Sequence, residues 1–310
     1  MATWHTIGLI PGNNPWLEPL PTGPVDLGNG VQLITIPEPL TTAQFTDDFG
    51  WKQISMLAGN PVRAITVQYE AGSLGDPEPG WKGPQPMSRE DYAALLLQLA
   101  NLAVWLVLPG NTLRFRHLVH VEATERTWYI REWTHAEPLY IGHRRREALN
   151  PEHLTAASQL STALGTVSLH SPLWMAVRCL WGGLVTGWFH NRYLLIWIAL
   201  ESLFGPRDPG EVRYRLSQQL AFFLAEKREA RYDLFRAAKK DYAERSKVVH
   251  GEGGGVKRDD WEALIDRAEE WVRAALVKIL KSPELIATFS DPQRRDELLE
   301  GGVFFPRGGV

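Results

Sequence analysis

Tyr242-Ala-Glu-Arg-Ser-Lys-Val-Val-His-Gly-Glu-Gly-Gly-Gly255 is the stretch from which the rest of this 310-residue chain is best interpreted. The residues before its glycines, from Arg231 to Val249, have apolar positions at helical spacing. Arg245 lies on the same stripe, where a guanidinium is costly unless another group pairs with it or uses it. His250 follows where the helix must end, because Gly251 favours termination. The apolar positions of the stripe are Phe235, Ala238, Tyr242 and Val249.

Arg245 and His250 are the candidate catalytic residues. On an ideal helix they are about 140° apart, so we expect the glycines to turn His250 back toward the arginine. The pair suits cleavage of RNA by its own 2′-OH, because a histidine exchanges protons near neutral pH and an arginine binds phosphate oxygens. This scheme requires no metal and no cofactor. The alternative is structural, with a histidine that stabilises the helix end and an arginine in an ion pair.

Three further residues are expected to support that site. Glu201 is in register with apolar residues of its own helix, so we expect it to meet Arg245 between two helices and to orient the guanidinium. Tyr242 and Ser246 can each donate a hydrogen bond to the same region. Their structural alternatives are a core aromatic residue for Tyr242 and a solvated helix residue for Ser246.

Composition excludes several classes of protein. A net charge of −3 argues against non-specific coating of nucleic acid through a global basic field. The single cysteine, Cys179, excludes an internal disulfide and fits a reducing cytosol, and no signal-peptide pattern begins the chain, so we expect a cytoplasmic protein. Residues 92–108 and 173–204 are apolar but too short or too interrupted by charge to span a membrane. We expect both to be buried helices.

Residues 1–150 are predicted to form a mixed α+β domain. A helix is expected from Ser88 to about Leu108, whereas residues 1–30 are rich in Pro and Gly and are expected to be irregular. The predicted strands, of which the last two form a hairpin, are Val31–Ile36, Val62–Glu70, Leu113–Ala123 and Thr127–Trp133. The histidines of this half lack the spacing of metal ligands; they are His117, His120, His135 and His143.

Residues 155–282 are predicted to form an all-α bundle. One helix is expected at 155–170 and another from Pro172, with a break near Gly182-Gly183 and a stop at Gly205-Pro206. Further amphipathic helices follow, and Ser282-Pro283 ends the last. Residues 283–310 are expected to be a tail with one short helix near Asp291–Glu300.

The second half resembles the HEPN superfamily, and most closely its Apea-like branch. The resemblance rests on Trp197-Ile-Ala-Leu-Glu201-Ser-Leu-Phe204 and on Tyr242-Ala-Glu-Arg-Ser-Lys-Val-Val-His250-Gly. Arg245 and His250, with four residues between them, meet the R-x4-6-H signature of that superfamily. The resemblance covers about residues 155–282, so the expected fold is an α+β domain followed by a HEPN-like helical bundle.

The resemblance implies a homodimer in which two Arg/His pairs share one cleft. Many members are metal-independent endoribonucleases of toxin–antitoxin and anti-phage defence systems, and they leave a 2′,3′-cyclic phosphate on RNA. Carried over to this chain, Arg245 would stabilise the phosphate and His250 would act as acid and base. Glu252 stands where some toxins of the family have a tyrosine that is modified, so control of that kind is not expected here.

The sequence therefore predicts a homodimeric endoribonuclease whose first domain senses a signal or positions the RNA. Two alternatives remain open. One is a non-catalytic HEPN module that binds RNA, a nucleotide or a protein partner. The other is a scaffold in which the bundle only dimerises.

Overall fold

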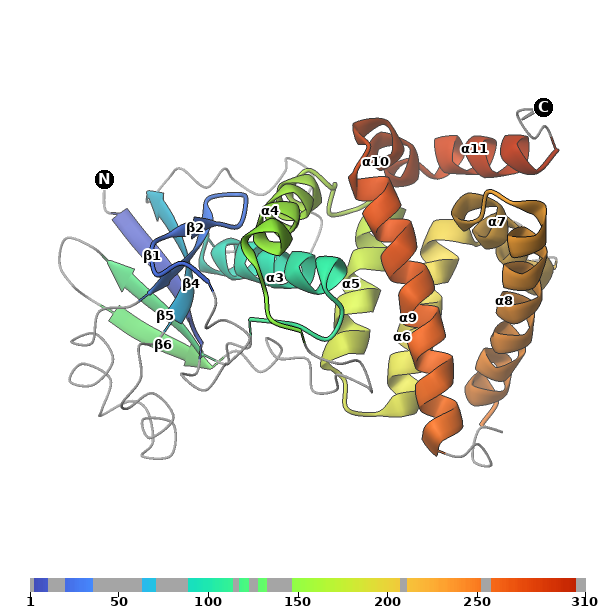
Figure 1. Cartoon of the computed structure of the whole chain (residues 1–310), viewed down its shortest axis with the longest axis horizontal. Coiled ribbons are helices and arrows are strands. Elements are labelled where there is room, and N and C mark those ends of the chain that lie inside the picture. The colour runs from blue at the N-terminus through green and yellow to red at the C-terminus, as the bar shows by residue number, and fades with distance from the viewer. Residues whose placement is uncertain are drawn as a thin grey trace. The chain divides into compact units, whose positions relative to one another are not determined.

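The computed structural model describes residues 3–10, 20–35, 63–70, 89–113, 117–122, 128–132, 147–206, 211–251 and 258–304. The chain divides into two compact units, Met1–Pro138 with Arg144–Gly165 and Leu139–His143 with Thr166–Val310. The first unit combines a sheet with helices, and in its described part the second is helical (Figure 1). The prediction of an α+β region followed by a helical one is therefore confirmed.

The described strands form one antiparallel sheet in the order β2-β3-β4-β1-β5-β6. Their bounds are β1 Thr3–Ile10, β2 Val25–Asp26, β3 Val31–Thr35, β4 Arg63–Glu70, β5 His117–Glu122 and β6 Trp128–Glu132. The four predicted strands correspond to β3, β4, β5 and β6. The predicted hairpin is confirmed, because β5 pairs with β6 and places Val121 opposite Trp128.

The prediction that residues 1–30 are irregular is wrong for β1. This strand lies inside the sheet, where Thr6 is opposite Val67 of β4 on one side and His120 of β5 on the other. Thr6 and His120 are buried, and their side chains share a hydrogen bond of 2.9 Å between Oγ1 and Nδ1. The prolines and glycines that suggested a loop begin only at Pro11, after the strand has ended.

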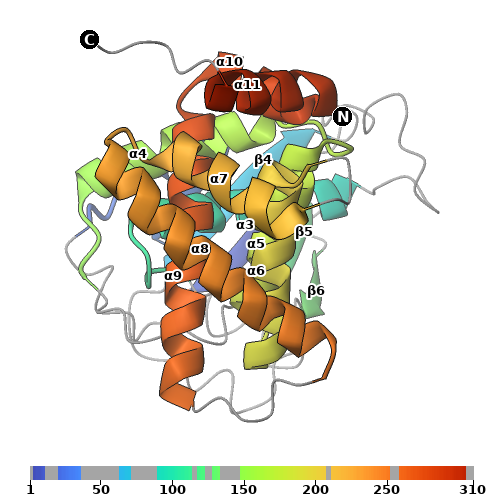
Figure 2. The same cartoon turned by 90° about the vertical axis from the view of Figure 1, so that its right-hand side faces the viewer.

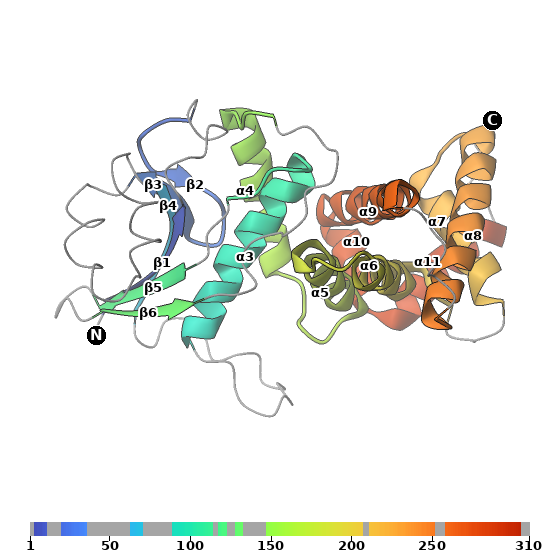
Figure 3. The same cartoon turned by 90° about the horizontal axis from the view of Figure 1, so that it is seen from below.

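Two helices pack beside the sheet in the first unit (Figure 3). Helix α3, Arg89–Val107, contacts β1, β3 and β4, and helix α4, Pro151–Gly165, contacts α3 and β2. Leu97, Leu102 and Leu106 of α3 are almost fully buried, which confirms that this apolar run is a core helix. Among the described residues, no helix combines the length and apolar character that crossing a membrane requires.

Helix α4 belongs to the first unit, whereas residues 155–170 were expected to open the bundle. A turn beside β2 holds it there. Asn29 Nδ2 donates a 2.6 Å hydrogen bond to the backbone oxygen of Ser161. Gly28 has φ +84°, and a Cβ added to it would lie 2.5 Å from the backbone oxygen of Ser158, so the turn and the helix touch through backbone. The unit boundary lies near residue 165 for this reason.

The second unit contains seven helices in its described part: α5 Pro172–Val185, α6 Phe189–Phe204, α7 Val212–Leu224, α8 Arg228–Val249, α9 Arg258–Leu280, α10 Pro283–Ser290 and α11 Pro292–Phe304. Predicted helix limits are confirmed at several points. Ser171 caps α5 by accepting a 3.0 Å hydrogen bond from the backbone N–H of Trp174, with Pro172 in the first turn. Gly183 permits the close approach of α6, because an added Cβ would lie 3.3 Å from Ile196.

Helix α6 is the centre of this unit. It packs against α5, α7, α8 and α9, and its Tyr193, Trp197 and Phe204 are fully buried. Helix α8 forms a hairpin with α7 and also contacts α6, as can be followed in Figure 2. This contact between α6 and α8 brings together two of the stretches that the sequence singled out.

The short helix expected near Asp291–Glu300 is confirmed by α11, whereas the expectation that residues 283–304 form a tail outside the bundle is wrong. Ser282 and Pro283 end α9 but also start α10, because the Ser282 hydroxyl accepts a hydrogen bond from the backbone N–H of Leu285. Phe289 is fully buried against Phe204 and Phe223. Arg295 of α11 donates hydrogen bonds to backbone oxygens at the end of α6, so these helices are part of the core.

Candidate functional site

Glu201, Tyr242 and Arg245 form a cluster where α6 meets α8. Nη2 of Arg245 lies 2.9 Å from Oε1 and 3.2 Å from Oε2 of Glu201. The hydroxyl of Tyr242 donates a 2.9 Å hydrogen bond to Oε1 of the same carboxylate. The predicted pairing of a carboxylate and a guanidinium on facing helices is therefore present, and one turn of α8 supplies both donors.

The cluster is only partly shielded from water. The Arg245 and Glu201 side chains are 22% and 25% exposed. The Tyr242 ring meets the buried ring of Trp197 edge to face at 5.2 Å, and the Arg245 guanidinium carbon lies 5.4 Å from the Tyr242 ring centre. Burial, followed by the charge and hydrogen bond of Glu201, raises the pKa of Tyr242 to about 12. Tyr242 is therefore a neutral donor at physiological pH.

Arg245 uses only part of its hydrogen-bonding capacity. Nη2 makes both contacts with Glu201, so the pair lacks the two parallel hydrogen bonds of an arginine fork. Nε is buried and has no hydrogen-bond partner among the described residues. The guanidinium is oriented by Glu201, and its remaining donors are uncommitted within the described chain.

His250 does not join the cluster. It is exposed, and its ring makes no hydrogen bond or ion pair with any residue that the structure describes. Its backbone has left the helical region at φ −88° and ψ 6°, and the left-handed turn follows at Gly251, with φ +77°. No hydrogen bond therefore joins His250 to Arg245 within the described residues, and the expectation that the glycines turn His250 toward the arginine stays a prediction. Residues 252–255 lie outside the described residues.

Two other residues of the quoted stretch, Ser246 and Val249, do not contribute to the cluster, and Ser246 fits its structural alternative. Ser246 is half-buried and its hydroxyl makes no hydrogen bond within the described residues; its backbone oxygen accepts from the His250 N–H at 3.2 Å. Val249 is 50% exposed, so the apolar stripe of α8 does not extend to it. The buried side of α8 therefore ends near Arg245, and the last turn of the helix faces solvent.

Two ion pairs behind the cluster were missed in the sequence. Asp241 is buried, its carboxylate accepts two hydrogen bonds from Arg267 of α9 at 2.9 and 3.1 Å, and its backbone oxygen accepts from Tyr193. These bonds to Asp241 raise the pKa of Arg267. Arg192 of α6 donates a 2.6 Å hydrogen bond to Glu269 of α9 in the core. The signal for both pairs was the one used for Glu201, a charge beside apolar residues at helical spacing.

These ion pairs fix α8 relative to α6 and α9, and thereby fix the position of Arg245.

Among the residues described, no group of three or more His, Cys, Asp or Glu side chains has the arrangement of a metal site. Cys179 is a buried free thiol, and burial raises its pKa, so it is poorly suited to act as a nucleophile.

Comparisons with models of known families, with curated proteins and with solved structures found no match.

Proposed function

We propose that this chain is a metal-independent endoribonuclease that cleaves RNA by attack of the 2′-OH and leaves a 2′,3′-cyclic phosphate. The observation that supports this most is Arg245, which Glu201 orients at a partly exposed position while other donors of its guanidinium stay uncommitted. His250 lies exposed on the same helix end. The HEPN resemblance of this stretch supports the same activity by analogy. The proposed role as a toxin or defence effector rests on the same analogy.

In this mechanism the two residues have separate tasks. His250 as the neutral imidazole accepts the proton of the 2′-OH while the 2′ oxygen bonds to phosphorus. The bond from phosphorus to the 5′ oxygen then breaks, and that oxygen takes a proton from an imidazolium. Arg245 donates hydrogen bonds to the non-bridging oxygens and offsets the charge that develops on them. Every step is a proton transfer or a displacement at phosphorus, so no metal is required.

The mechanism also requires a second copy of the chain. No hydrogen bond joins Arg245 and His250 within the described chain, and on an ideal helix their positions are about 140° apart. A two-fold dimer that joins the ends of two α8 helices would place the arginine of one copy near the histidine of the other. We therefore propose a composite site, with each phosphate held by residues of both copies.

Cleavage of mixed RNA in EDTA tests this proposal. We expect the wild type to cut, and His250→Ala to be slower by roughly 10²- to 10⁴-fold, as for loss of a general acid and base. Arg245→Ala should be slower by about 10²-fold or more. Lys281→Ala is the control, because this exposed lysine follows the end of α9 and has no part in the proposed site, so the variant should cut like the wild type. No cleavage by the wild type, or equal cleavage by all variants, would refute the proposal.

One observation favours a second function, a HEPN module that binds RNA, a nucleotide or a protein without cutting. Glu201 already neutralises part of the Arg245 charge, and His250 does not contact the arginine. A site used only for binding needs no such contact. If the wild type binds RNA but produces no fragments, this alternative is supported. If the chain dimerises but binds no RNA, the remaining hypothesis is a scaffold in which the bundle only dimerises.

A further inference from the structure

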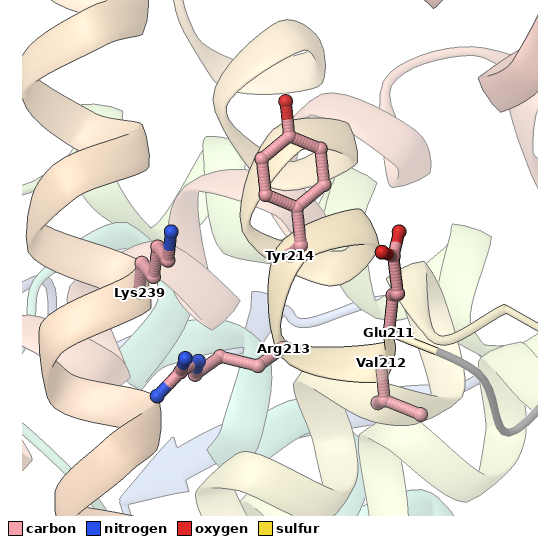
Figure 4. A pocket seen from close by; sticks show the side chains of 5 residues that line it. All are labelled: Glu211, Val212, Arg213, Tyr214 and Lys239. Carbon is pink, nitrogen blue, oxygen red and sulfur yellow. The ribbon is translucent and has the colours of Figure 1, made fainter.

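A second site with its own chemistry lies between α7 and α8, away from the Glu201–Arg245 cluster. It is an open pocket of about 480 Å³ lined by Glu211, Val212, Arg213, Tyr214 and Lys239 (Figure 4). That volume is within the range of about 300–1,000 Å³ that is usual for small-ligand sites. Lys239 precedes Arg245 by six residues, so it lies about 9 Å along α8 and about 120° around it. The two sites are distinct.

The two cations of this pocket have no carboxylate partner among the residues that the structure describes. Arg213 and Lys239 form no ion pair within the described chain, whereas other cations of this unit do. Its paired arginines are Arg192, Arg215, Arg245, Arg267, Arg273 and Arg295. The carboxylate of Glu211 also lines the pocket, but in Figure 4 it lies on the other side of Tyr214 from both cationic groups. The half of the pocket that faces α8 is therefore positive.

An aromatic ring stands beside these cations. Tyr214 is 44% exposed, although its ring is large and apolar. The edge-to-face contact with Phe235 at 5.3 Å fixes the ring, and Nζ of Lys239 lies 5.5 Å from its centre. A fixed, exposed ring next to cations offers stacking for a planar group and hydrogen bonds for an anion attached to it.

We propose that this pocket binds a nucleoside phosphate unit, with the base on Tyr214 and the phosphate between Arg213 and Lys239. A peptide carboxylate would use the cations but not the ring, whereas a nucleotide uses both. The net charge of −3 means that attraction of such an anion must be local to the pocket. The unit can come from a single-stranded RNA chain or from a free nucleotide, and the same chemistry recognises both.

Binding can be measured independently of cleavage. The probes are a fluorescein-labelled eight-nucleotide 2′-O-methyl RNA, which has no free 2′-OH to attack, and unlabelled AMP as competitor. Fluorescence anisotropy gives the dissociation constant at several salt concentrations. Displacement of the RNA by AMP identifies a site that takes free nucleotides, and binding of RNA without displacement identifies one that takes nucleotides within a chain. Either result supports the pocket, whether or not the wild type cuts RNA.

Variants then assign the binding to the pocket. Tyr214→Ala should weaken binding about tenfold, while Tyr214→Phe should retain it, since every base stacks on a phenyl ring. Lys239→Ala should weaken binding and lower the slope of log K against log salt by about 0.7. Tyr232→Ala is the matched control. Tyr232 of α8 is exposed like Tyr214 and has Arg236 over its ring, but it does not line the pocket.

Three results would overturn the proposal. They are the failure of the labelled RNA to bind at millimolar concentration, wild-type affinity in Tyr214→Ala and Lys239→Ala, and an equal loss in the Tyr232→Ala control. Loss of RNA binding in Arg245→Ala alone would assign the RNA to the other cluster. Circular dichroism of each variant checks that the helices remain folded, which the exposure of Tyr214 and Tyr232 favours.

Discussion

Replacing Glu201 by glutamine removes the charge that faces Arg245 but keeps an oxygen that can accept from Tyr242. The structure indicates how much this should cost. Exposed ion pairs contribute about 0.2–1 kcal/mol, and removing one partner of a fully buried pair costs about 3–5 kcal/mol. The Glu201 and Arg245 side chains are about three-quarters buried, and a single nitrogen makes both contacts. We therefore expect a coupling energy of about 1–2 kcal/mol.

A double-mutant cycle measures this coupling. The free energy of urea unfolding is determined for the wild type, Glu201→Gln, Arg245→Met and the double variant. Arg245→Met should cost less than Glu201→Gln, because it also removes the buried Nε that has no partner within the described chain. The matched control is the Glu244–Lys247 pair at 2.8 Å, which is more exposed and should couple by only about 0.3 kcal/mol. A coupling energy for Glu201 and Arg245 no larger than that of the control would refute the reasoning.

Three further predictions concern stability. Burial and Glu201 raise the pKa of Tyr242 to about 12, so the folded state keeps its proton where the unfolded state loses it near pH 10. The free energy of unfolding therefore falls as pH rises from 10 through 12. Measured by urea unfolding over that range, it should fall less in Tyr242→Phe than in the wild type, and an identical fall would contradict this. Gly28 has φ +84°, and an added Cβ would lie 2.5 Å from a backbone oxygen of α4, so Gly28→Ala should lower the free energy of unfolding by about 2 kcal/mol. Gly23 has open space around it, so Gly23→Ala should melt like the wild type. Phe289→Ala should cost about 3–5 kcal/mol because the ring is fully buried, and a cost no greater than that of Leu298→Ala, at an exposed site, would argue against a core role for α10.

The helical half was largely predictable because its signals are local. Ser171 and Pro172 start a helix, Gly205 ends one, and apolar residues at helical spacing fill the intervals. The charge of Glu201 on such a stripe predicted its partner across the helix interface. Ser282-Pro283 was more ambiguous, because a serine before a proline ends one helix and can cap the next.

The remaining features depend on contacts that local patterns do not reveal. β1 is followed directly by a Pro- and Gly-rich stretch, so only its partners on both sides identify it as an inner strand. Helix α4 was assigned to the wrong unit because its partner, the turn at Asn29, is more than 120 residues earlier in the sequence. The position of His250 depends on whether the chain turns before or after it, a difference of one residue that the glycines do not specify.

Complementation between inactive variants tests the composite site most directly. Arg245→Ala and His250→Ala proteins are purified, mixed in equal amounts under conditions in which dimers exchange, and assayed for RNA cleavage in EDTA. Random pairing gives half heterodimers, each with one intact pair of residues from two copies, so we predict recovery of about a quarter of wild-type activity, with 2′,3′-cyclic phosphate ends. A mixture as inactive as either variant alone would contradict a site formed by Arg245 and His250 of different copies.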